Sequence, residues 1–371
     1  MHQPKFSGTR CSSHLLHCLC VVWCLESCTS AEPIAQTAAE LSPGSFSATG
    51  WMADSRFGHA ATLLDDGRVL ISGGWFDPDA APWRRSELYD PTSGTFSRTA
   101  GDLMIARAAH TSTALSDGRV ILTGGTEWSQ DYFVANNTVE IFDPVSSAFS
   151  PSSPMGHPRL AHTATVLVTG NILITGGCNP VTGTAELYDP STSSFTQTGS
   201  MASWRCYHTG TLLNDGRVLI VGGWGAASSA EIYDPKEGTF TSAGRTVYPH
   251  SQHTATLLPD GNVLIAGGGS AGAEVYDPIA ATFVSTGNMF SSRGAHSATL
   301  LSNGGVLIAG GIWDVVSEFY NLETGSFFQD ADMLTPVVEH TATLLLSGQV
   351  FIAGGWTTGA QIYTPGEVTF K

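Results

Sequence analysis

The sequence predicts an all-β fold built from seven copies of one four-stranded unit. Three observations predict it: a histidine that recurs with a Gly-Gly pair fourteen residues later, short apolar runs joined by tight-turn dipeptides, and aromatic pairs spaced seven residues apart. Seven identical offsets are the signature of a repeat architecture, in which each copy is one supersecondary unit. The histidines and first glycines are His59 and Gly73, His110 and Gly124, His162 and Gly176, His208 and Gly222, His253 and Gly267, His296 and Gly310, and His340 and Gly354.

The first two strands of each copy are predicted to form a β-hairpin. In the first copy an alternating run over 59–64 is followed by Asp66-Gly67 and a second apolar run over 69–71. The glycine of such a dipeptide tolerates positive φ, which fixes the register of the two strands. Equivalent dipeptides stand at Asp117-Gly118, Thr169-Gly170, Asp215-Gly216, Asp260-Gly261, Asn303-Gly304 and Ser347-Gly348.

A third strand is predicted where Glu-x-Tyr-Asp-Pro recurs, because proline lacks the backbone donor that would continue the ladder. This motif spans 87–91, 186–190, 231–235 and 274–278. A phenylalanine seven residues after the tyrosine, as with Tyr89 and Phe96, marks a fourth strand. Each copy therefore holds four antiparallel strands.

This unit, repeating every 43 to 52 residues, resembles the kelch repeat over residues 45–371. The resemblance implies a seven-bladed β-propeller, in which four-stranded blades pack radially and protect their own edges. Phe46 lies thirteen residues before His59 without strands of its own, and the chain stops at Lys371, one residue past Phe370. We therefore expect an N-terminal strand, residues 45–52, to complete the seventh blade and close the ring.

Residues 1–30 differ in character from the repeats. Lys5 and Arg10 precede an apolar run over 15–25 and a group of small residues, an arrangement typical of a secretory signal peptide. A lipoprotein signal at 25–28 and a misassigned start codon are the alternatives. The expected organisation is a signal peptide or leader at 1–30, a linker at 31–44 and the kelch propeller at 45–371. The expected location is secreted or periplasmic.

Composition restricts the partners. The formal net charge is -16, and after residue 30 the lysines are Lys236 and Lys371 alone, so no basic stripe is available for a nucleic acid. No stretch approaches the roughly 20 apolar residues that a membrane helix needs. We expect a monomer without a transmembrane segment, with a protein or carbohydrate as its ligand.

Two repeated charged residues are interpreted as scaffold. Most histidines follow an arginine by three residues, and most third strands carry a glutamate; the seventh copy has lost both, with Val337 and Gln361 in their places. Joint loss indicates that the two residues pair within a blade. The arginines are Arg56, Arg107, Arg159, Arg205 and Arg293, and the glutamates are Glu87, Glu140, Glu186, Glu231, Glu274 and Glu318, with His250 opposite Glu274.

The seven histidines are expected near one mouth of the central channel. Zinc usually takes four ligands at about 2.0–2.3 Å, and a seven-fold spacing around a channel is too wide for that. We therefore expect these histidines to hydrogen-bond neighbouring backbone rather than a metal.

The fourth copy departs from the others at 205–208, Arg-Cys-Tyr-His, which resembles the copper-ligand strand of galactose oxidase. The resemblance implies Tyr207 and His208 as copper ligands. That family also needs a second tyrosine cross-linked to a cysteine, and the positions equivalent to Tyr207 are Gly58, Ala109, Ala161, Gln252, Ala295 and Glu339. We therefore expect no copper centre.

Cys178 and Cys206 are expected on one face of adjacent blades, as a disulfide or as buried thiols.

Recognition is expected at the loops between the double glycine and the third strand, which are longest in copies one and two. Insertions there leave the hydrogen bonding of a rigid ring intact, and aromatic rings beside carboxylates suit a sugar or a protein hot spot. The candidate binding residues are Trp75, Phe76, Asp77, Trp83, Arg84, Trp128, Asp131, Tyr132 and Phe133. Packing of these rings over neighbouring blades is the alternative, and for Trp224 and Trp356 it is the favoured one.

The leading functional hypothesis is an extracytoplasmic, non-enzymatic binding module that recognises a carbohydrate or a protein through these loops. The alternative is a sugar-acting enzyme, oxidase-like or epimerase-like, with a site at the channel mouth that uses Arg205, Tyr207 and His208. A structural propeller in a surface assembly is a third hypothesis. We assign no catalytic residue, no metal ligand and no cofactor.

Overall fold

A computed structural model describes residues 39–77, 81–129, 132–311, 315–366 and 368–370. The chain divides into a unit of residues 1–40 with 370–371 and a unit of residues 41–369. Strands β1 (Ala39–Leu41) and β32 (Val368–Phe370) pair with each other, and the propeller is formed by the larger unit. The predicted leader at 1–30 and the first part of the linker lie outside the described residues.

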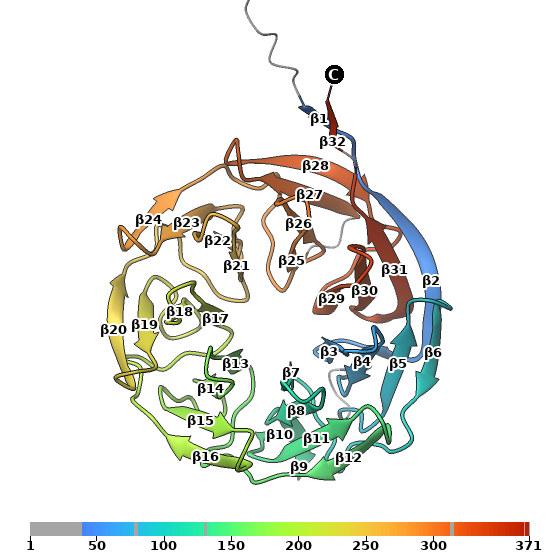
Figure 1. Cartoon of the computed structure of the whole chain (residues 1–371), viewed down its shortest axis with the longest axis vertical. Helices are drawn as coiled ribbons and strands as arrows, with labels where there is room; N and C mark the ends of the chain where they lie inside the picture. Colours follow the sequence, from blue (N-terminus) through green and yellow to red (C-terminus); the bar gives the residue numbers. More distant parts are fainter. Residues whose placement is uncertain (1–38, 78–80, 130–131, 312–314, 367, 371) are drawn as a thin grey trace, which may run out of the picture. The chain divides into compact units, whose positions relative to one another are not determined.

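Seven four-stranded antiparallel sheets in the described residues form the blades of a propeller, which confirms the predicted fold class (Figure 1). Blade one holds β3 (Ala60–Leu63), β4 (Val69–Ser72), β5 (Ser86–Asp90) and β6 (Thr95–Arg98); blade two holds β7 (Thr111–Ala114), β8 (Val120–Thr123), β11 (Val139–Asp143) and β12 (Ala148–Pro151); blade three holds β13 (Thr163–Val166), β14 (Ile172–Thr175), β15 (Ala185–Asp189) and β16 (Ser194–Gln197); blade four holds β17 (Thr209–Leu212), β18 (Val218–Val221), β19 (Ala230–Asp234) and β20 (Thr239–Gly244). Blade five holds β21 (Thr254–Leu257), β22 (Val263–Ala266), β23 (Ala273–Asp277) and β24 (Thr282–Ser285); blade six holds β25 (Ser297–Leu300), β26 (Val306–Ala309), β27 (Val316–Asn321) and β28 (Ser326–Asp332); blade seven holds β29 (His340–Leu344), β30 (Val350–Gly354), β31 (Thr357–Thr364) and β2 (Ser45–Arg56). A further hairpin of β9 (Thr126–Ser129) and β10 (Tyr132–Ala135), which the repeat does not predict, occupies the long loop of blade two.

The core lies between the blades. The second strand of every blade is buried along its whole length, which explains why these strands read as continuous apolar runs. Between blades one and seven, for example, Val69 and Ile71 pack against Phe351 and Ala353, and Tyr89 stacks on Phe351 with ring centroids 4.0 Å apart. Because each blade buries its faces against two neighbours, the ring is stable only when closed.

Strand β2 closes the ring, as the orphan Phe46 predicts. It pairs antiparallel with β31 in the register Ser45↔Thr364 and Phe46↔Tyr363. The rings of Phe46 and Tyr363 lie 5.1 Å apart, close to the 5.0 Å of the corresponding Tyr89 and Phe96 in blade one. Blade seven therefore takes its outermost strand from the start of the propeller, beside β31 in Figure 1.

The predicted arginine and glutamate pairs are confirmed, and they are buried. In blade three, Arg159 Nη2 donates to Glu186 Oε1 at 2.8 Å and its Nη1 donates to the carbonyl of Gly176 at 2.6 Å. The other oxygen of Glu186 accepts the backbone N–H of Gly156 at 2.6 Å. Each pair thus ties the entry of a blade to its second and third strands. The equivalent pairs are Arg56–Glu87, Arg107–Glu140, Arg205–Glu231, Arg293–Glu318 and His250–Glu274.

Blade seven shows how the pair can be lost without leaving a buried charge. Val337 packs in the core between blades six and seven, and Gln361 Oε1 accepts the backbone N–H of Leu334 at 2.8 Å. The amide therefore keeps the backbone contact that glutamate makes elsewhere and gives up only the charge. Removing both partners together avoids the penalty of one unpaired buried ion.

One further observation bears on location. Cys178 and Cys206 form a disulfide between blades three and four, which is consistent with an extracytoplasmic compartment. No helix in the described ranges is long and apolar enough to cross a membrane.

Candidate functional site at the mouth of the central channel

Seven residues with a left-handed backbone surround one mouth of the channel. They are the residues immediately before the repeated histidines, and their φ angles lie between 50° and 59°. We call this set the channel annulus: Gly58, Ala109, Ala161, Tyr207, Gln252, Ala295 and Glu339. Only glycine adopts this conformation without steric strain, so the fold holds six other side chains there at a cost of roughly 1–2 kcal/mol each.

The annulus is held by a closed circle of backbone hydrogen bonds between blades. The N–H of Tyr207 donates to the carbonyl of Ala161 at 3.0 Å, and the N–H of Gln252 donates to the carbonyl of Tyr207 at 3.1 Å. The same bond links each blade to the preceding one, and Gly58 completes the circle with a bond to the carbonyl of Glu339 at 3.2 Å. The left-handed backbone lets each residue donate to one neighbour and accept from the other.

The repeated histidines line the wall next to the annulus, and the structure corrects the prediction about their partners. Each Nε2 is hydrogen-bonded to a serine or threonine hydroxyl of the preceding blade, at 2.8–3.0 Å, rather than to backbone. His208, for example, lies 2.9 Å from Thr175 Oγ1. Nearby backbone groups are already used by the strand ladders and the annulus, so a side-chain hydroxyl is the partner that remains.

These histidines are neutral at physiological pH. Burial, reinforced by nearby arginine charges, lowers the pKa of His59, His162, His208 and His296 to about 3. Burial alone lowers that of His340 to about 4. The histidine ring is therefore a set of uncharged links between blades.

Packing of these rings also explains the double glycines. A Cβ on the first glycine, Gly73, would lie 2.9 Å from Cε1 of His110 in the next blade. A Cβ on the second, Gly74, would lie 2.8 Å from Cβ of His59 in its own blade. The glycine pair thus leaves room for the histidine of the next blade and for the histidine of its own blade. The fourteen-residue offset follows from the register of the hairpin, in which His340 stands opposite Gly354.

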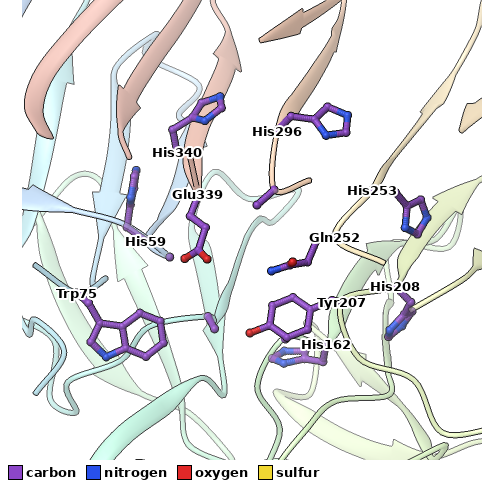
Figure 2. A pocket seen from close by; sticks show the side chains of 14 residues that line it. His59, Trp75, His162, Tyr207, His208, Gln252, His253, His296, Glu339 and His340 are labelled. Atoms are coloured by element: carbon purple, nitrogen blue, oxygen red, sulfur yellow. The ribbon is translucent and has the colours of Figure 1, made fainter. Parts of the chain in front are cut away.

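A cavity of about 320 Å³ opens at this mouth and is lined by the annulus, six of the histidines and Trp75. The side chains of Trp75, Tyr207, Gln252 and Glu339 point into the same space (Figure 2). In the described residues neither the Glu339 carboxylate nor the Trp75 indole N–H has a hydrogen-bond partner. The pocket therefore presents an aromatic face, a phenol, an amide and a carboxyl group to a ligand.

The electrostatics of the pocket are set by Glu339. Burial raises the pKa of its carboxyl group. Burial also raises the pKa of Tyr207, and the negative charge of Glu339 adds to that shift. The tyrosine is therefore a neutral hydrogen-bonding group, and Glu339 is the group whose charge a ligand would meet.

Of the loop residues predicted from the sequence, Trp75 is the one that the described part of the chain places in this pocket. Its ring packs on Phe57 with centroids 5.5 Å apart and meets Phe133 edge-on at 5.6 Å, whereas Asp77 is exposed. Asp131 and the side chains of Trp128 and Tyr132 lie outside the described parts.

The other loop residues pack on the scaffold of blade one. Phe76 and Trp83 are in ring contact at 5.2 Å, and the Trp83 indole donates to the carbonyl of Ser55 at 3.3 Å. Arg84 Nε donates to the carbonyl of Leu103 at 2.7 Å. Trp224 and Trp356 contact Tyr207 and Phe57 respectively, as expected for caps, although each stays partly exposed.

Gln252 and Glu339 are not among the site residues predicted from the sequence, which identifies both only as positions equivalent to Tyr207. The signal was their position, since each directly precedes a repeated histidine as Tyr207 does. What was missing was the left-handed backbone and the hydrogen-bonded circle that turn this position toward the channel.

The residues present do not fit a copper centre of the galactose oxidase kind. His208 Nε2 is hydrogen-bonded to Thr175, Arg205 is ion-paired with Glu231, and Cys178 and Cys206 are joined in a disulfide, so neither of these cysteines is free to cross-link a second tyrosine. Among the described residues no three His, Cys, Asp or Glu side chains gather as metal ligands. Of the three residues of the channel-mouth alternative, Tyr207 alone has its functional group free in the pocket.

No family model matches the sequence, and no curated protein matches it. Among solved structures, the chain is similar to one described as a novel fungal alcohol oxidase of the AA5 family in complex with copper, with a TM-score of 0.71 and 18% sequence identity. The match covers 87% of this chain and 76% of that chain. At this identity the likeness shows the fold alone, the seven-bladed propeller described above.

Proposed function

We propose that the protein is an extracytoplasmic carbohydrate-binding module whose site is the channel-mouth pocket. One observation carries this proposal: the side chains that break the seven-fold repeat converge there, whereas the repeated polar side chains are used by the scaffold. Tyr207, Gln252 and Glu339 depart from the glycine and alanine of the other annulus positions, and all three face one cavity. Divergence inside a constant framework is typical of a binding site.

The chemistry of the lining suits a sugar. The ring of Trp75 offers an apolar face for the C–H groups of a pyranose, and a phenol, an amide and a carboxylate offer donors and acceptors for its hydroxyls. The volume of about 320 Å³ lies at the lower end of the range of small-molecule sites, about 300–1,000 Å³. The long loops of blades one and two would extend the surface on the side of Trp75, with Phe133 as the first contact.

Binding of monosaccharides and oligosaccharides to the full chain, measured on a glycan array and then by calorimetry, tests the proposal. We expect Trp75→Ala to abolish or greatly weaken binding. Trp51→Ala is the matched control, because Trp51 lies on the outermost strand β2 and its side chain is 71% exposed. Equal loss in both variants, or no glycan binding by the wild-type protein, would contradict the proposal and favour a protein ligand.

The same pocket supports a second candidate, a sugar-acting enzyme that moves a proton. The observation that favours it is a carboxyl group that lines the pocket and whose pKa is raised by burial, since a raised pKa suits a carboxyl group to proton transfer. Incubation of the wild-type protein with its bound sugar, followed by product analysis, separates the two functions. Turnover that Glu339→Gln abolishes while binding persists would establish the enzyme; an unchanged ligand would establish the binding module.

A further inference from the structure

We propose that the channel-mouth pocket takes a sugar that carries a free ammonium group, with the Glu339 carboxylate as its counter-ion. This inference rests on the proposed carbohydrate-binding function and names the class of sugar.

The charge of the lining supports the inference. Apart from Glu339, the lining residues are glycine, alanine, tryptophan, tyrosine, glutamine and histidine, and burial keeps the histidines neutral. The repeated arginines, three residues before the histidines, do not line the cavity, and each is paired with a glutamate of its own blade. Among the described lining residues, Glu339 is therefore the one group that can carry a charge at neutral pH.

The carboxylate of Glu339 lacks a partner in the protein. No described residue donates a hydrogen bond to it or forms an ion pair with it, and burial raises its pKa without an opposing cation. A partly buried carboxylate without a partner is unfavourable, and a ligand cation would relieve that cost. Because the protein has a formal net charge of -16, its long-range field also draws cations rather than anions.

The backbone fixes the direction in which the Glu339 side chain leaves the ring. Glu339 has a φ of 55°, its N–H donates to the carbonyl of Ala295 at 3.1 Å, and its own carbonyl accepts from Gly58. The same backbone conformation recurs at every annulus position, so it belongs to the ring and does not depend on the ligand. The aromatic faces of Trp75 and Tyr207 line the same cavity and attract a cation through their ring quadrupoles.

The charges of the lining residues also argue against acidic sugars as ligands. A uronate or a sialic acid would bring a second carboxylate beside Glu339, and no arginine or lysine is among the described lining residues to receive it. Like charges in a partly buried site repel strongly. N-acetylation of an amino sugar removes the positive charge while leaving the ring unchanged, so it provides a matched probe.

The test is calorimetry with the full chain at pH 7 and physiological ionic strength. The probes are glucosamine and galactosamine, each compared with its N-acetyl derivative and with the corresponding neutral hexose. We expect an amino sugar that enters the pocket to bind at least about tenfold more tightly than its N-acetyl derivative and the neutral hexose. A factor of this size corresponds to the difference in free energy between a charge-assisted and a neutral hydrogen bond. Glu339→Gln should remove this preference while leaving weak binding of the neutral sugar.

Glu339→Ala provides a second variant, because alanine occupies the same left-handed position at Ala109, Ala161 and Ala295 and the ring should fold with it. Neutral sugars that bind as tightly as amines would overturn the inference and leave the proposed function standing. An amine preference that survives in both variants would also overturn it, by showing attraction to the acidic surface. Absence of binding by every sugar would overturn both.

Discussion

The repeated histidines and the annulus residues that precede them are neighbours in the sequence with opposite behaviour. At the histidine positions both the backbone and the side chain repeat seven times, and every Nε2 is hydrogen-bonded to the preceding blade. At the annulus positions the backbone repeats, with a φ of 50–59°, while the side chains range from hydrogen to phenol and carboxylate. The comparison teaches that the ring uses the side chain of one position to hold blades together and leaves the side chain of the adjacent position free to vary.

The buried ion pairs of the scaffold are expected to have the largest effects on stability. Arg159→Val leaves Glu186 buried without its partner, and we expect a loss of about 3–5 kcal/mol in the free energy of unfolding. The double variant Arg159→Val with Glu186→Gln copies the arrangement of Val337 and Gln361 in blade seven.

Chemical denaturation of both variants checks this prediction. We expect the double variant to recover most of the stability that the single variant loses, since no buried charge remains. A double variant as unstable as the single one would show that the arginine acts mainly through its bonds to backbone carbonyls.

The second effect is a dependence on pH that comes from the histidine ring. In the unfolded chain these histidines have their ordinary pKa of 6.5, whereas the folded ring lowers it to about 3 for His59, His162, His208 and His296. Above pH 7 both states are neutral and the ring adds no pH dependence. Below pH 6.5 the unfolded chain takes up protons that the folded protein cannot, so stability falls by about 1.4 kcal/mol per pH unit for each histidine.

Denaturant midpoints measured between pH 7.5 and pH 4 check this effect. We expect stability to be flat above pH 7 and to fall steeply below pH 6. His340→Gln should reduce the slope of stability against pH by about 1.4 kcal/mol per pH unit, because one of the histidines that takes up a proton on unfolding is gone. A slope that does not change in this variant would mean that carboxylates, not the histidine ring, cause the acid sensitivity.

The smallest effect belongs to the annulus backbone. Ala161→Gly removes a Cβ from a left-handed position, and we expect stabilisation of a few tenths to about 1 kcal/mol, because relief of strain exceeds the added chain entropy of glycine. Thermal unfolding followed by circular dichroism is sensitive enough to detect it. Ala164→Gly, in strand β13 beside it, is the control and should destabilise the protein.

The sequence predicted the scaffold well because its physical causes are local or repeated. The spacing from each histidine to its glycine reflects the register of one hairpin, as the pairing of His340 with Gly354 shows, and the orphan Phe46 marks the closing strand. The joint loss at Val337 and Gln361 is enough to infer that the arginine and the glutamate of the other blades pair.

The site was predicted only in part, because it depends on backbone conformation and on contacts around the whole ring. Tyr207 and Trp75 were among the candidates, but nothing in the residues alone showed that Gln252 and Glu339 share a left-handed backbone that turns them into the same cavity. Hydrogen bonding of the histidines to hydroxyls also escaped prediction, since the partner lies on another blade. Long-range closure of the ring, rather than local propensity, decides these features.

The central claim is that the varied side chains of the annulus form the binding site on a constant ring. Its most direct test is a calorimetric titration of the triple variant Tyr207→Ala, Gln252→Ala and Glu339→Ala with the glycan that the wild-type protein binds most tightly. Its annulus would match the alanines at Ala109, Ala161 and Ala295, so its melting temperature should stay within a few degrees of the wild type. We predict a folded protein that has lost glycan binding. A folded variant that binds with unchanged affinity would contradict the account and direct attention to the loops of blades one and two.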